Sequence, residues 1–281
     1  MLIECVVNVS EGRDQAVLHE LASCAGSVLL DLHRDPDHHR SVFTLAGSAE
    51  EVTAGAQGLA RACVARLDLR THLGAHPRRG VLDVVPFVPY GPGESVAHPD
   101  LGAVVPVRDA FARWLSSELG VPTFLYGPLP GGGIRTLPQV RAGLFEQITP
   151  DFGPPQPHPS AGATAVGARP VLVAYNVWVS SPEVARQVAP LVRSPAVRAL
   201  GLAVGDRAQV SCNLIDPGTY GPAALFDAVS DRVRAAGGDV RGAELVGLLP
   251  DAVLRVIPRR RWATLGLAEE QTVESRLARR A

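Results

Sequence analysis

Two histidines and two arginines stand close together in residues 71–80, THLGAHPRRG, directly before the apolar run VLDVVPF. The apolar run predicts a buried strand, and the glycines and proline before it predict a stiff loop at the mouth of that strand. An imidazole titrates near neutral pH, so it can accept a proton and return it during a reaction. A guanidinium offers a planar fork to a carboxylate. The loop therefore predicts acid–base group transfer on a small, polyanionic substrate.

Two further segments, NVSEGR at 8–13 and HRDPDHHR at 33–40, carry similar side chains and also adjoin predicted core strands. Because neighbouring strands would bring such loops to one edge of a sheet, we expect the three segments to form one site. A solvated loop is the alternative for any one of them. The long polar tip at 33–40 favours a functional role, since a hairpin turn needs only two residues such as Asp-Gly.

A metal site is another alternative, because these segments contain common metal-binding side chains. The spacing is poor, since Gly74 and Pro77 argue against the helix that would align the two histidines of the loop. The chain has no H-E-x-x-H motif and no C-x-x-C pair, so we expect no metal. The plausible ligands would be His33, Asp35, Asp37, His38, His39, His72 and His76.

Other catalytic classes fit less well. Ser10 does not lie in a G-x-S-x-G elbow, and the glycine-rich stretch near 127–133 lacks the strand–loop–helix frame of a dinucleotide site. All 27 basic residues are arginine. The absence of lysine excludes Schiff-base catalysis, pyridoxal phosphate attachment and a P-loop.

The order of strands and helices that would position these side chains occurs twice, once in each half of the chain. Strands are predicted at 3–9, 27–33, 41–47 and 81–88, with helices at 13–25 and 49–66. The second half predicts strands at 170–179, 197–204, 207–214 and 240–248, with helices at 182–193 and 220–236. Both halves have the order β-α-β-β-α-β, which predicts an α+β protein of two ferredoxin-like units, each a mostly antiparallel sheet with helices on one face.

Between the two repeats the sequence predicts a helix at 106–119, a short strand PTFLYG and two loop-like stretches, GPLPGGGIRTLP and TPDFGPPQPHPSAGATAVGARP. The second stretch is either a linker or, as its prolines favour, a stiff binding loop between subdomains. We therefore expect an N-terminal subdomain over 1–169 and a C-terminal subdomain over 170–281.

Composition narrows the setting. A net charge of −1 over 281 residues, 46% of them hydrophobic, gives no global field toward nucleic acid or an anionic membrane. No apolar run approaches the ~20 residues of a membrane span, and the N-terminus predicts a core strand and not a signal peptide. The four scattered cysteines are typical of reduced core residues. We expect a cytoplasmic protein with neither nucleic-acid nor membrane partners.

Several segments, in order along the chain, resemble one family. They are ECVVNVSEGRD, DPDHHRSVFTLAG, HLGAHPRRGVLDVVPFVP, PDFGP with GATAVGAR, VLVAYNVWV, AQVSCNL and AELVGLLP. Together they resemble the glutamate formiminotransferase domain, the N-terminal part of formiminotransferase-cyclodeaminase. The similarity extends to about residue 250, and we expect no cyclodeaminase domain.

This resemblance implies transfer of a formimino group from N-formimino-L-glutamate to N5 of tetrahydrofolate, the co-substrate. It implies two α/β subdomains with a folate-binding tunnel between them, a homodimer, and a catalytic histidine at His76. The family's folate-contacting loop falls on Gly153, Pro154, Pro155, Gln156, Pro157, His158, Pro159, Ser160, Ala161 and Gly162.

The residues fit that chemistry. His76 would take the proton from the attacking nitrogen and return it to the departing one, with Arg78 beside it. Asp35 would stabilise the cationic amidine carbon, with Asp37 or Asp83 as alternatives. The substrate carboxylates would be held by a second set of side chains, namely Arg40, Arg79 and His33.

Three positions depart from the family pattern. His33 stands where a second acidic residue is usual, Arg79 stands where methionine is usual, and GPLPGGGIRT is shorter than its counterpart. These departures leave open another donor, such as N-formylglutamate, or a folate- or carboxylate-binding module without catalysis.

Overall fold

The computed structural model describes residues 1–74, 78–91 and 99–280 of the 281. They separate into two compact units, the first formed by residues 1–91 and 99–169 and the second by residues 170–280. Each unit has its own sheet and its own hydrophobic core.

The first unit begins with the expected repeat: β1 (Leu2–Val9), α1 (Gln15–Ala25), β2 (Leu29–Asp35), β3 (Arg40–Ser48), α2 (Ala49–Arg66) and β4 (Leu82–Tyr90). These strands lie in the order β2-β3-β1-β4, and each neighbouring pair is antiparallel. The start of α2 matches its prediction because Ser48 and Glu51 form a capping box.

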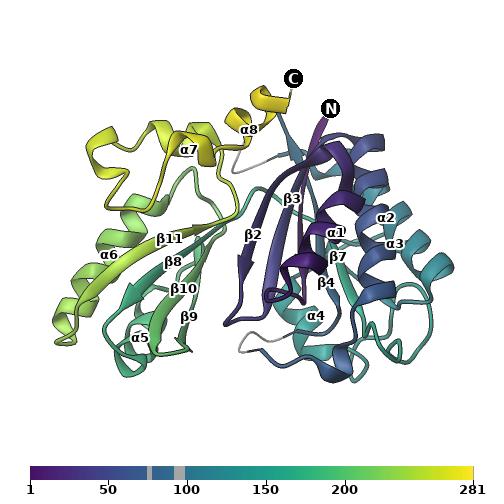
Figure 1. Cartoon of the computed structure of the whole chain (residues 1–281), viewed down its shortest axis with the longest axis horizontal. Helices are drawn as coiled ribbons and strands as arrows, with labels where there is room; N and C mark the ends of the chain where they lie inside the picture. Colours follow the sequence, from purple (N-terminus) through teal and green to yellow (C-terminus); the bar gives the residue numbers. More distant parts are fainter. Residues whose placement is uncertain (75–77, 92–98, 281) are drawn as a thin grey trace. The chain divides into compact units, whose positions relative to one another are not determined.

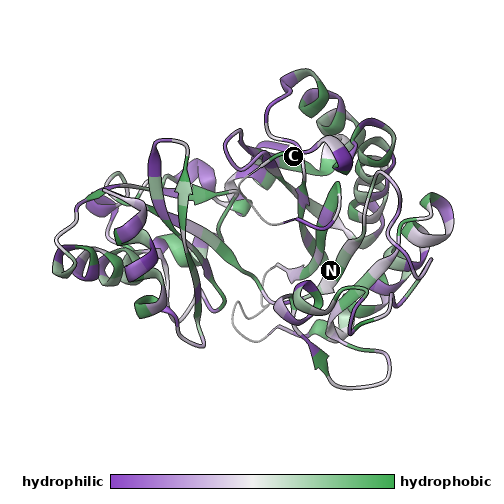
Figure 2. Cartoon of the chain, turned by 90° about the horizontal axis from the view of Figure 1, so that it is seen from below, coloured by the Kyte–Doolittle hydropathy of each residue, from purple (hydrophilic) through white to green (hydrophobic). Residues whose placement is uncertain are grey.

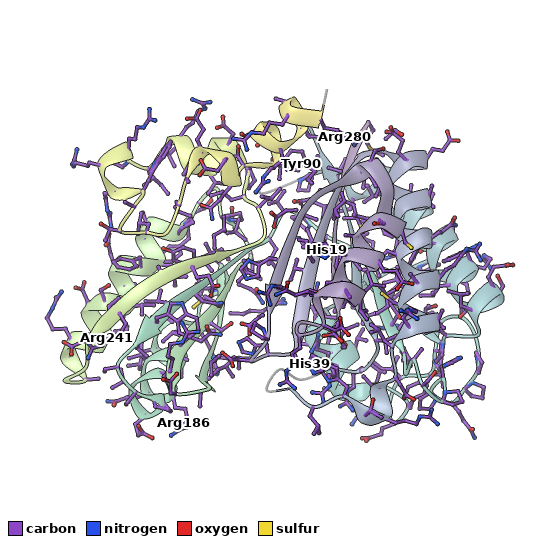
Figure 3. All side chains as sticks on the ribbon, in the orientation of Figure 1. His19, His39, Tyr90, Arg186, Arg241 and Arg280 are labelled. Atoms are coloured by element: carbon purple, nitrogen blue, oxygen red, sulfur yellow. The ribbon has the colours of Figure 1, made fainter. Side chains whose placement is uncertain are left out.

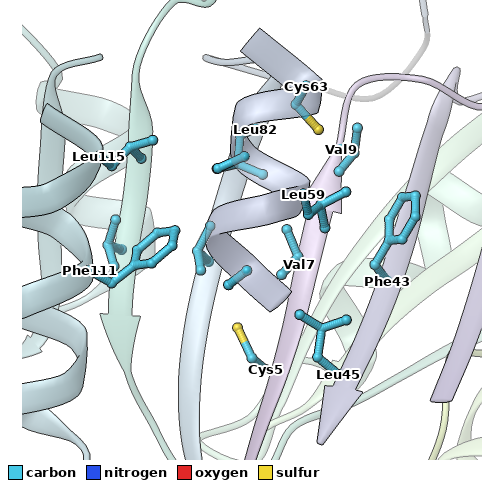
Figure 4. Packing of buried hydrophobic residues seen from close by; sticks show 14 of the residues in the cluster. Cys5, Val7, Val9, Phe43, Leu45, Leu59, Cys63, Leu82, Phe111 and Leu115 are labelled. Atoms are coloured by element: carbon cyan, nitrogen blue, oxygen red, sulfur yellow. The ribbon is translucent and has the colours of Figure 1, made fainter. Parts of the chain in front are cut away.

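The larger of the two described core clusters of this unit lies under one face of the sheet. Alternate residues of β1 point toward α1, α2 and α3 (Val105–Leu119), which lie along that face (Figure 1). Figure 4 shows Cys5, Val7 and Val9 packed against side chains from α2 and β3. This two-residue period places the odd-numbered residues of β1 in the core and the even-numbered ones on the opposite face.

Three more strands extend this sheet: β5 (Thr123–Pro128), β6 (Ile134–Arg135) and β7 (Thr164–Ala168), with α4 (Leu137–Gly143) between β6 and β7. The full order is β2-β3-β1-β4-β7-β5-β6, and β7 is parallel to both β4 and β5. The side chain of Val140 in α4 packs on the sheet face opposite α1–α3, against residues of β4, β5 and β7.

The prediction of two loop-like stretches in this region is therefore wrong in part. The first contains β6 and the start of α4, and the second contains β7. The sequence of β7, TAVGA, is too short and too rich in small residues to show a hydrophobic period. Its neighbours need those small residues, because a Cβ on Gly167 would overlap the ring of Tyr126.

The second unit contains β8 (Val173–Val179), α5 (Pro182–Val188), β9 (Val197–Val204), β10 (Arg207–Leu214), α6 (Pro222–Ala235), β11 (Val240–Val246), α7 (Asp251–Arg255) and α8 (Val273–Arg280). Its sheet has the order β11-β8-β10-β9 and is antiparallel throughout. The helix expected at 182–193 continues after Val188 as a 3-10 turn, Ala189–Val192, which contains Pro190.

The mixed α and β character expected from the sequence is confirmed, with two sheets on which helices pack. Hydrophobic residues run along the strands of both sheets and along the helix faces turned toward them (Figure 2). No helix within the described ranges has the length and hydrophobicity that crossing a membrane requires.

A histidine- and arginine-rich candidate active site

The three polar segments expected to gather at one edge of the sheet do lie together. The end of β1 is beside the start of β4, because the two strands are antiparallel neighbours with Val9 paired to Leu82. Ser10 strengthens this junction: its N–H donates to the carbonyl of Val81 and its hydroxyl to the carbonyl of Gly80, both at 2.8 Å. Arg13 Nε donates to the carbonyl of Pro36 at 2.8 Å, which joins the first segment to the β2–β3 hairpin.

Asp35 organises the tip of that hairpin. Its Oδ1 accepts the backbone N–H groups of Asp37 and His38 at 2.9 and 2.8 Å, and its Oδ2 lies 3.7 Å from His38 Nε2. The carboxylate proposed to face the substrate thus has a structural role in the turn. The register places Asp35 opposite Arg40 and His33 opposite Val42, so all four side chains lie on one face of the sheet.

His39, at the end of the hairpin tip (Figure 3), and His72 form a stacked pair. Their ring centroids are 4.0 Å apart and the rings are inclined by 13°. His39 Nδ1 lies 2.9 Å from the carbonyl oxygen of Leu73, and His39 Nε2 lies 3.2 Å from Glu11 Oε1. His72 Nε2 lies 2.8 Å from the carbonyl oxygen of His39. The pair therefore links all three segments.

His76, the expected base, lies outside the described residues, and so do its neighbours Ala75 and Pro77. Arg78 follows them directly in the sequence. Its Nη1 donates to the carbonyl of Gly74 at 3.0 Å and its Nη2 to the carbonyl of His72 at 2.6 Å. Arg78, which follows residues 75–77, thus binds the backbone of residues that precede them. This contact fixes the position of the chain before His76.

Asp83 interacts with two further arginines, Arg79 and Arg141. Its Oδ1 accepts the backbone N–H of Arg79 at 2.7 Å, and its Oδ2 pairs with Arg141 Nη2 at 2.5 Å, although only 4% of the Asp83 side chain is exposed. The guanidinium of Arg79 reaches the carbonyl of Arg141 at 3.3 Å. Asp83 therefore connects the loop before β4 to α4.

Arg40 is the second cation near Asp83. Its guanidinium donates to the Asn8 side chain, with Nε at 3.1 Å. Burial lowers the pKa of Arg40 to about 10; Asp83 opposes this shift and Arg141 adds to it. Arg40 and Arg141 place two positive charges beside the single negative charge of Asp83. A ligand carboxylate near both arginines would therefore be attracted. The arrangement suits a substrate with acidic groups.

The predicted folate loop is described throughout, and its two ends have different surroundings. Gly153 to Pro157 are exposed, and Gly153 packs against Ser116 at the end of α3. The other end joins the candidate site: Val81 N–H donates to the carbonyl of Ala161 at 3.0 Å and Ala163 N–H to that of Arg79 at 2.9 Å.

The sequence did not indicate Arg141 as a site residue. It placed Asn8, Glu11, His39 and His72 in the three segments expected to form the site, but it gave Asn8 and Glu11 no individual role and named His39 and His72 individually only as possible metal ligands. Arg141 follows a stretch expected to be a loop, so nothing placed it on a helix over the sheet. Asn8 stands at an outward position of a predicted strand beside Arg40, and this alternation was the available signal. Among the described residues, no group of three or more histidine, cysteine or acidic side chains is arranged to hold a metal ion.

The fold and this site define an α/β protein with an anion-attracting, histidine-containing centre at the end of a sheet. Residues 2–169 match a family model described as the formiminotransferase domain, N-terminal subdomain. The chain belongs to the formiminotransferase family, which confirms the resemblance seen in the sequence motifs.

Individual relatives agree. The chain is 34% identical to the glutamate formimidoyltransferase of Streptococcus pyogenes serotype M1, over 90% of both chains. It is 30% identical to a glutamate formimidoyltransferase of Thermoplasma acidophilum, over 100% of this chain and 98% of that one. It is 36% identical to the formimidoyltransferase-cyclodeaminase of Sus scrofa over 89% of its length, and there it spans half of the longer protein.

Proposed function

We propose that this chain transfers the formimino group of N-formimino-L-glutamate to N5 of tetrahydrofolate, giving 5-formiminotetrahydrofolate and glutamate. The class of enzyme expected from the sequence, a one-carbon transferase, agrees with the family and with the names of its relatives. The observation that carries the proposal is the meeting of the family motifs 8–13, 33–40 and 78–83 around Arg40, Asp83 and Arg141.

In the proposed reaction N5 of tetrahydrofolate attacks the amidine carbon and a tetrahedral intermediate forms. The bond from that carbon to the glutamate nitrogen then breaks. The proton lost by N5 passes to His76, which returns it to the glutamate nitrogen, so no net proton is consumed. A general acid–base group of this kind typically contributes ~10²–10⁴-fold to the rate.

The described side chains support separate roles around that histidine. Arg40 and Arg141 would bind the donor carboxylates, with Asp83 holding Arg141 in place. Arg79 and His33 would complete the substrate site. Arg78, which follows the base in the chain, would act by fixing the backbone that precedes it, through its bonds to the carbonyls of His72 and Gly74.

The larger organisation is proposed on the same basis. Residues 1–169 would carry the catalytic histidine and the folate loop Gly153–Gly162, and residues 170–281 would form the C-terminal subdomain. Within each β-α-β-β-α-β unit the strands lie in the same order across the sheet: second, third, first, fourth. This order is β2-β3-β1-β4 in the first unit and β9-β10-β8-β11 in the second, and it supports two ferredoxin-like units. A homodimer and a cytoplasmic location remain predictions.

The test is a product assay with purified protein, tetrahydrofolate and formiminoglutamate. The product is followed by absorbance after acid converts it to 5,10-methenyltetrahydrofolate. We expect turnover by the wild type, and loss of turnover with retained folate affinity in His76→Ala. Folate binding without product would leave only the binding-module function, and a fully active His76→Ala would exclude His76 as the base.

A second donor, N-formylglutamate, is favoured by one observation. His33 lies on the same sheet face as Arg40. It stands where the family pattern has an acidic residue, whose carboxylate would balance a cationic amidine. A formamide is neutral and needs no such carboxylate. Parallel assays with the two donors, read by the mass of the folate product, decide between them.

A further inference from the structure

We propose that His39 is a positioning residue for this reaction: as an imidazolium that donates from both ring nitrogens, it ties residues 72–74 to the β2–β3 hairpin and to Glu11. The inference rests on the proposed function only in assigning the base to His76, two residues beyond Gly74. The geometry of the His39 contacts stands independently of that assignment.

The two partners of His39 determine its protonation. A carbonyl oxygen can only accept, so Nδ1 must donate to Leu73. Nε2 faces Glu11 Oε1, which already accepts the backbone N–H groups of Gly12, Arg13 and Asp14 at 2.8, 2.6 and 3.0 Å. A lone pair on Nε2 would point at this carboxylate oxygen, whereas an N–H forms a charge-assisted hydrogen bond.

Glu11 is suited to this role because it is held ionised. Burial alone would raise the pKa of Glu11, but hydrogen bonds from the backbone N–H groups and attraction to His39 together lower it. The carboxylate therefore persists as the counter-charge of an imidazolium at neutral pH.

The stacked partner takes the opposite state. His72 Nε2 must donate, because it faces the carbonyl of His39, and the buried Nδ1 of His72 has no hydrogen-bond partner in the part of the chain that the structure describes. Burial lowers the pKa of His72; the bond to the His39 carbonyl opposes the shift, and the charges of His39 and Arg78 add to it. A neutral ring stacked on a cation avoids the repulsion of two imidazolium ions.

The surroundings leave little freedom for residues 72–74. Gly74 packs so closely on the hairpin that a Cβ there would overlap the carbonyl oxygen of His38. Among the described residues, the charged or titratable groups around this point include Arg78, bonded to the backbone of His72 and Gly74, and Arg13, bonded to the carbonyl of Pro36. The hairpin adds Asp35, Asp37 and His38. His39 is the contact that joins the loop, the hairpin and the end of β1.

The consequence is a rigid entry to the proposed base. Catalysis by a positioned group is sensitive to displacements of about 1 Å, which can cost ~10²-fold in rate. Loss of the His39 contacts should therefore act on turnover through the placement of residues 72–74, without removing a group that touches substrate.

The test compares His39→Asn with His19→Asn. Asparagine tolerates the left-handed backbone of residue 39, whose φ is +51°, and keeps the carbonyl that His72 needs. His19 is an exposed histidine on α1 and serves as the matched control. Glu11→Gln removes the charge of the carboxylate but keeps an oxygen for the three N–H groups. It tests the same contact from the other partner, so the proposal can still be tested if His39→Asn misfolds.

The first readout is NMR of the ring nitrogens. In the wild type at pH 7 we expect protons on both nitrogens of His39 and on Nε2 alone of His72. His39→Asn should raise the pKa of His72, because a neighbouring positive charge is lost and Glu11 remains, while His19→Asn leaves it unchanged. A His39 ring with one bare nitrogen at pH 7, or an unshifted His72, would overturn the proposal.

The second readout is kinetic. We expect kcat/KM to fall about 10- to 100-fold in His39→Asn and Glu11→Gln, mostly through kcat, and to stay unchanged in His19→Asn. If the wild type transfers formimino groups and both variants keep full kcat, the positioning role is wrong and the proposed function stands. If the wild type has no activity, the proposed function fails. The contacts of His39 with Leu73 and Glu11 are then tested by the NMR result and by amide exchange at residues 72–74, which we expect to be faster in His39→Asn than in the wild type.

Discussion

At the scale of single residues, the charge balance of the candidate site depends on Asp83. This side chain is almost fully buried and accepts both the Arg79 N–H and the Arg141 guanidinium, while Arg40 lies close enough for its pKa to respond to it. A buried carboxylate shared in this way holds cations that would otherwise repel each other.

We expect Asp83→Ala to destabilise the protein by about 1–3 kcal/mol, because it leaves the Arg79 N–H and the partly buried Arg141 guanidinium without their acceptor. Urea denaturation measures the change. Asp239→Ala is the control, since its pair with Arg241, at 3.4 Å, is exposed on both sides, and we expect no measurable effect. Similar stability of the two variants would contradict the role assigned to Asp83.

His72 predicts a pH dependence of stability. Its pKa in the fold lies below the ordinary value of 6.5, chiefly because of burial. As the pH falls through 6.5 the unfolded chain takes up the proton first, so stability is lost on acidification. We expect the free energy of unfolding to fall less between pH 7.5 and 5.5 in His72→Gln than in the wild type. Glu11 does not interfere, because its contribution is lost only below its ordinary value of 4.5. Equal pH slopes in the two proteins would show that His72 is not shifted.

At the scale of elements, the site is built where the starts of β4, β7 and β5 meet, because these strands are parallel. The end of the proposed folate loop joins them: Gly162 pairs with Gly80 in an isolated bridge and its N–H donates to the carbonyl of His158 at 2.9 Å. Gly162 has φ +72°, and a Cβ there would overlap the carbonyl oxygen of Arg79.

Gly162→Ala should therefore lower both stability and folate affinity. The left-handed backbone alone costs roughly 1–2 kcal/mol for a residue with a Cβ, and the overlap with backbone adds to it. Gly132→Ala separates the two causes, since Gly132 has φ +89° but open space around it. Thermal unfolding measures stability, and titration with tetrahydrofolate measures affinity. Equal losses of stability and affinity in the two variants would show that the close approach of Gly162 to the Arg79 carbonyl has no role.

At the scale of the whole molecule, the two units have separate cores. That of the second unit is formed by β8–β11 with α5, α6 and the C-terminal segments, and it includes Tyr175, whose hydroxyl donates to the carbonyl of Leu265 at 2.6 Å. An element set with its own buried core is expected to fold as a unit.

We therefore expect residues 170–281, produced alone, to give a cooperative urea transition and a dispersed NMR spectrum. Residues 1–169 provide the companion measurement. A collapsed but non-cooperative C-terminal fragment would mean that its core depends on the first unit.

The sequence by itself determined the repeated elements and the family. Regular apolar alternation and the Ser48 cap located strands and helices within a few residues, because these signals are local. The motif at 71–87 likewise indicated where charged side chains meet a core strand. Only the tertiary structure decided that the Ala- and Gly-rich β7 lies inside the sheet, since its partners are distant in the chain and its own residues carry no periodic signal. Only the tertiary structure brought Arg141 to Asp83 and Glu11 to His39, because pairing of side chains 58 and 28 residues apart follows from packing and register and not from any local pattern.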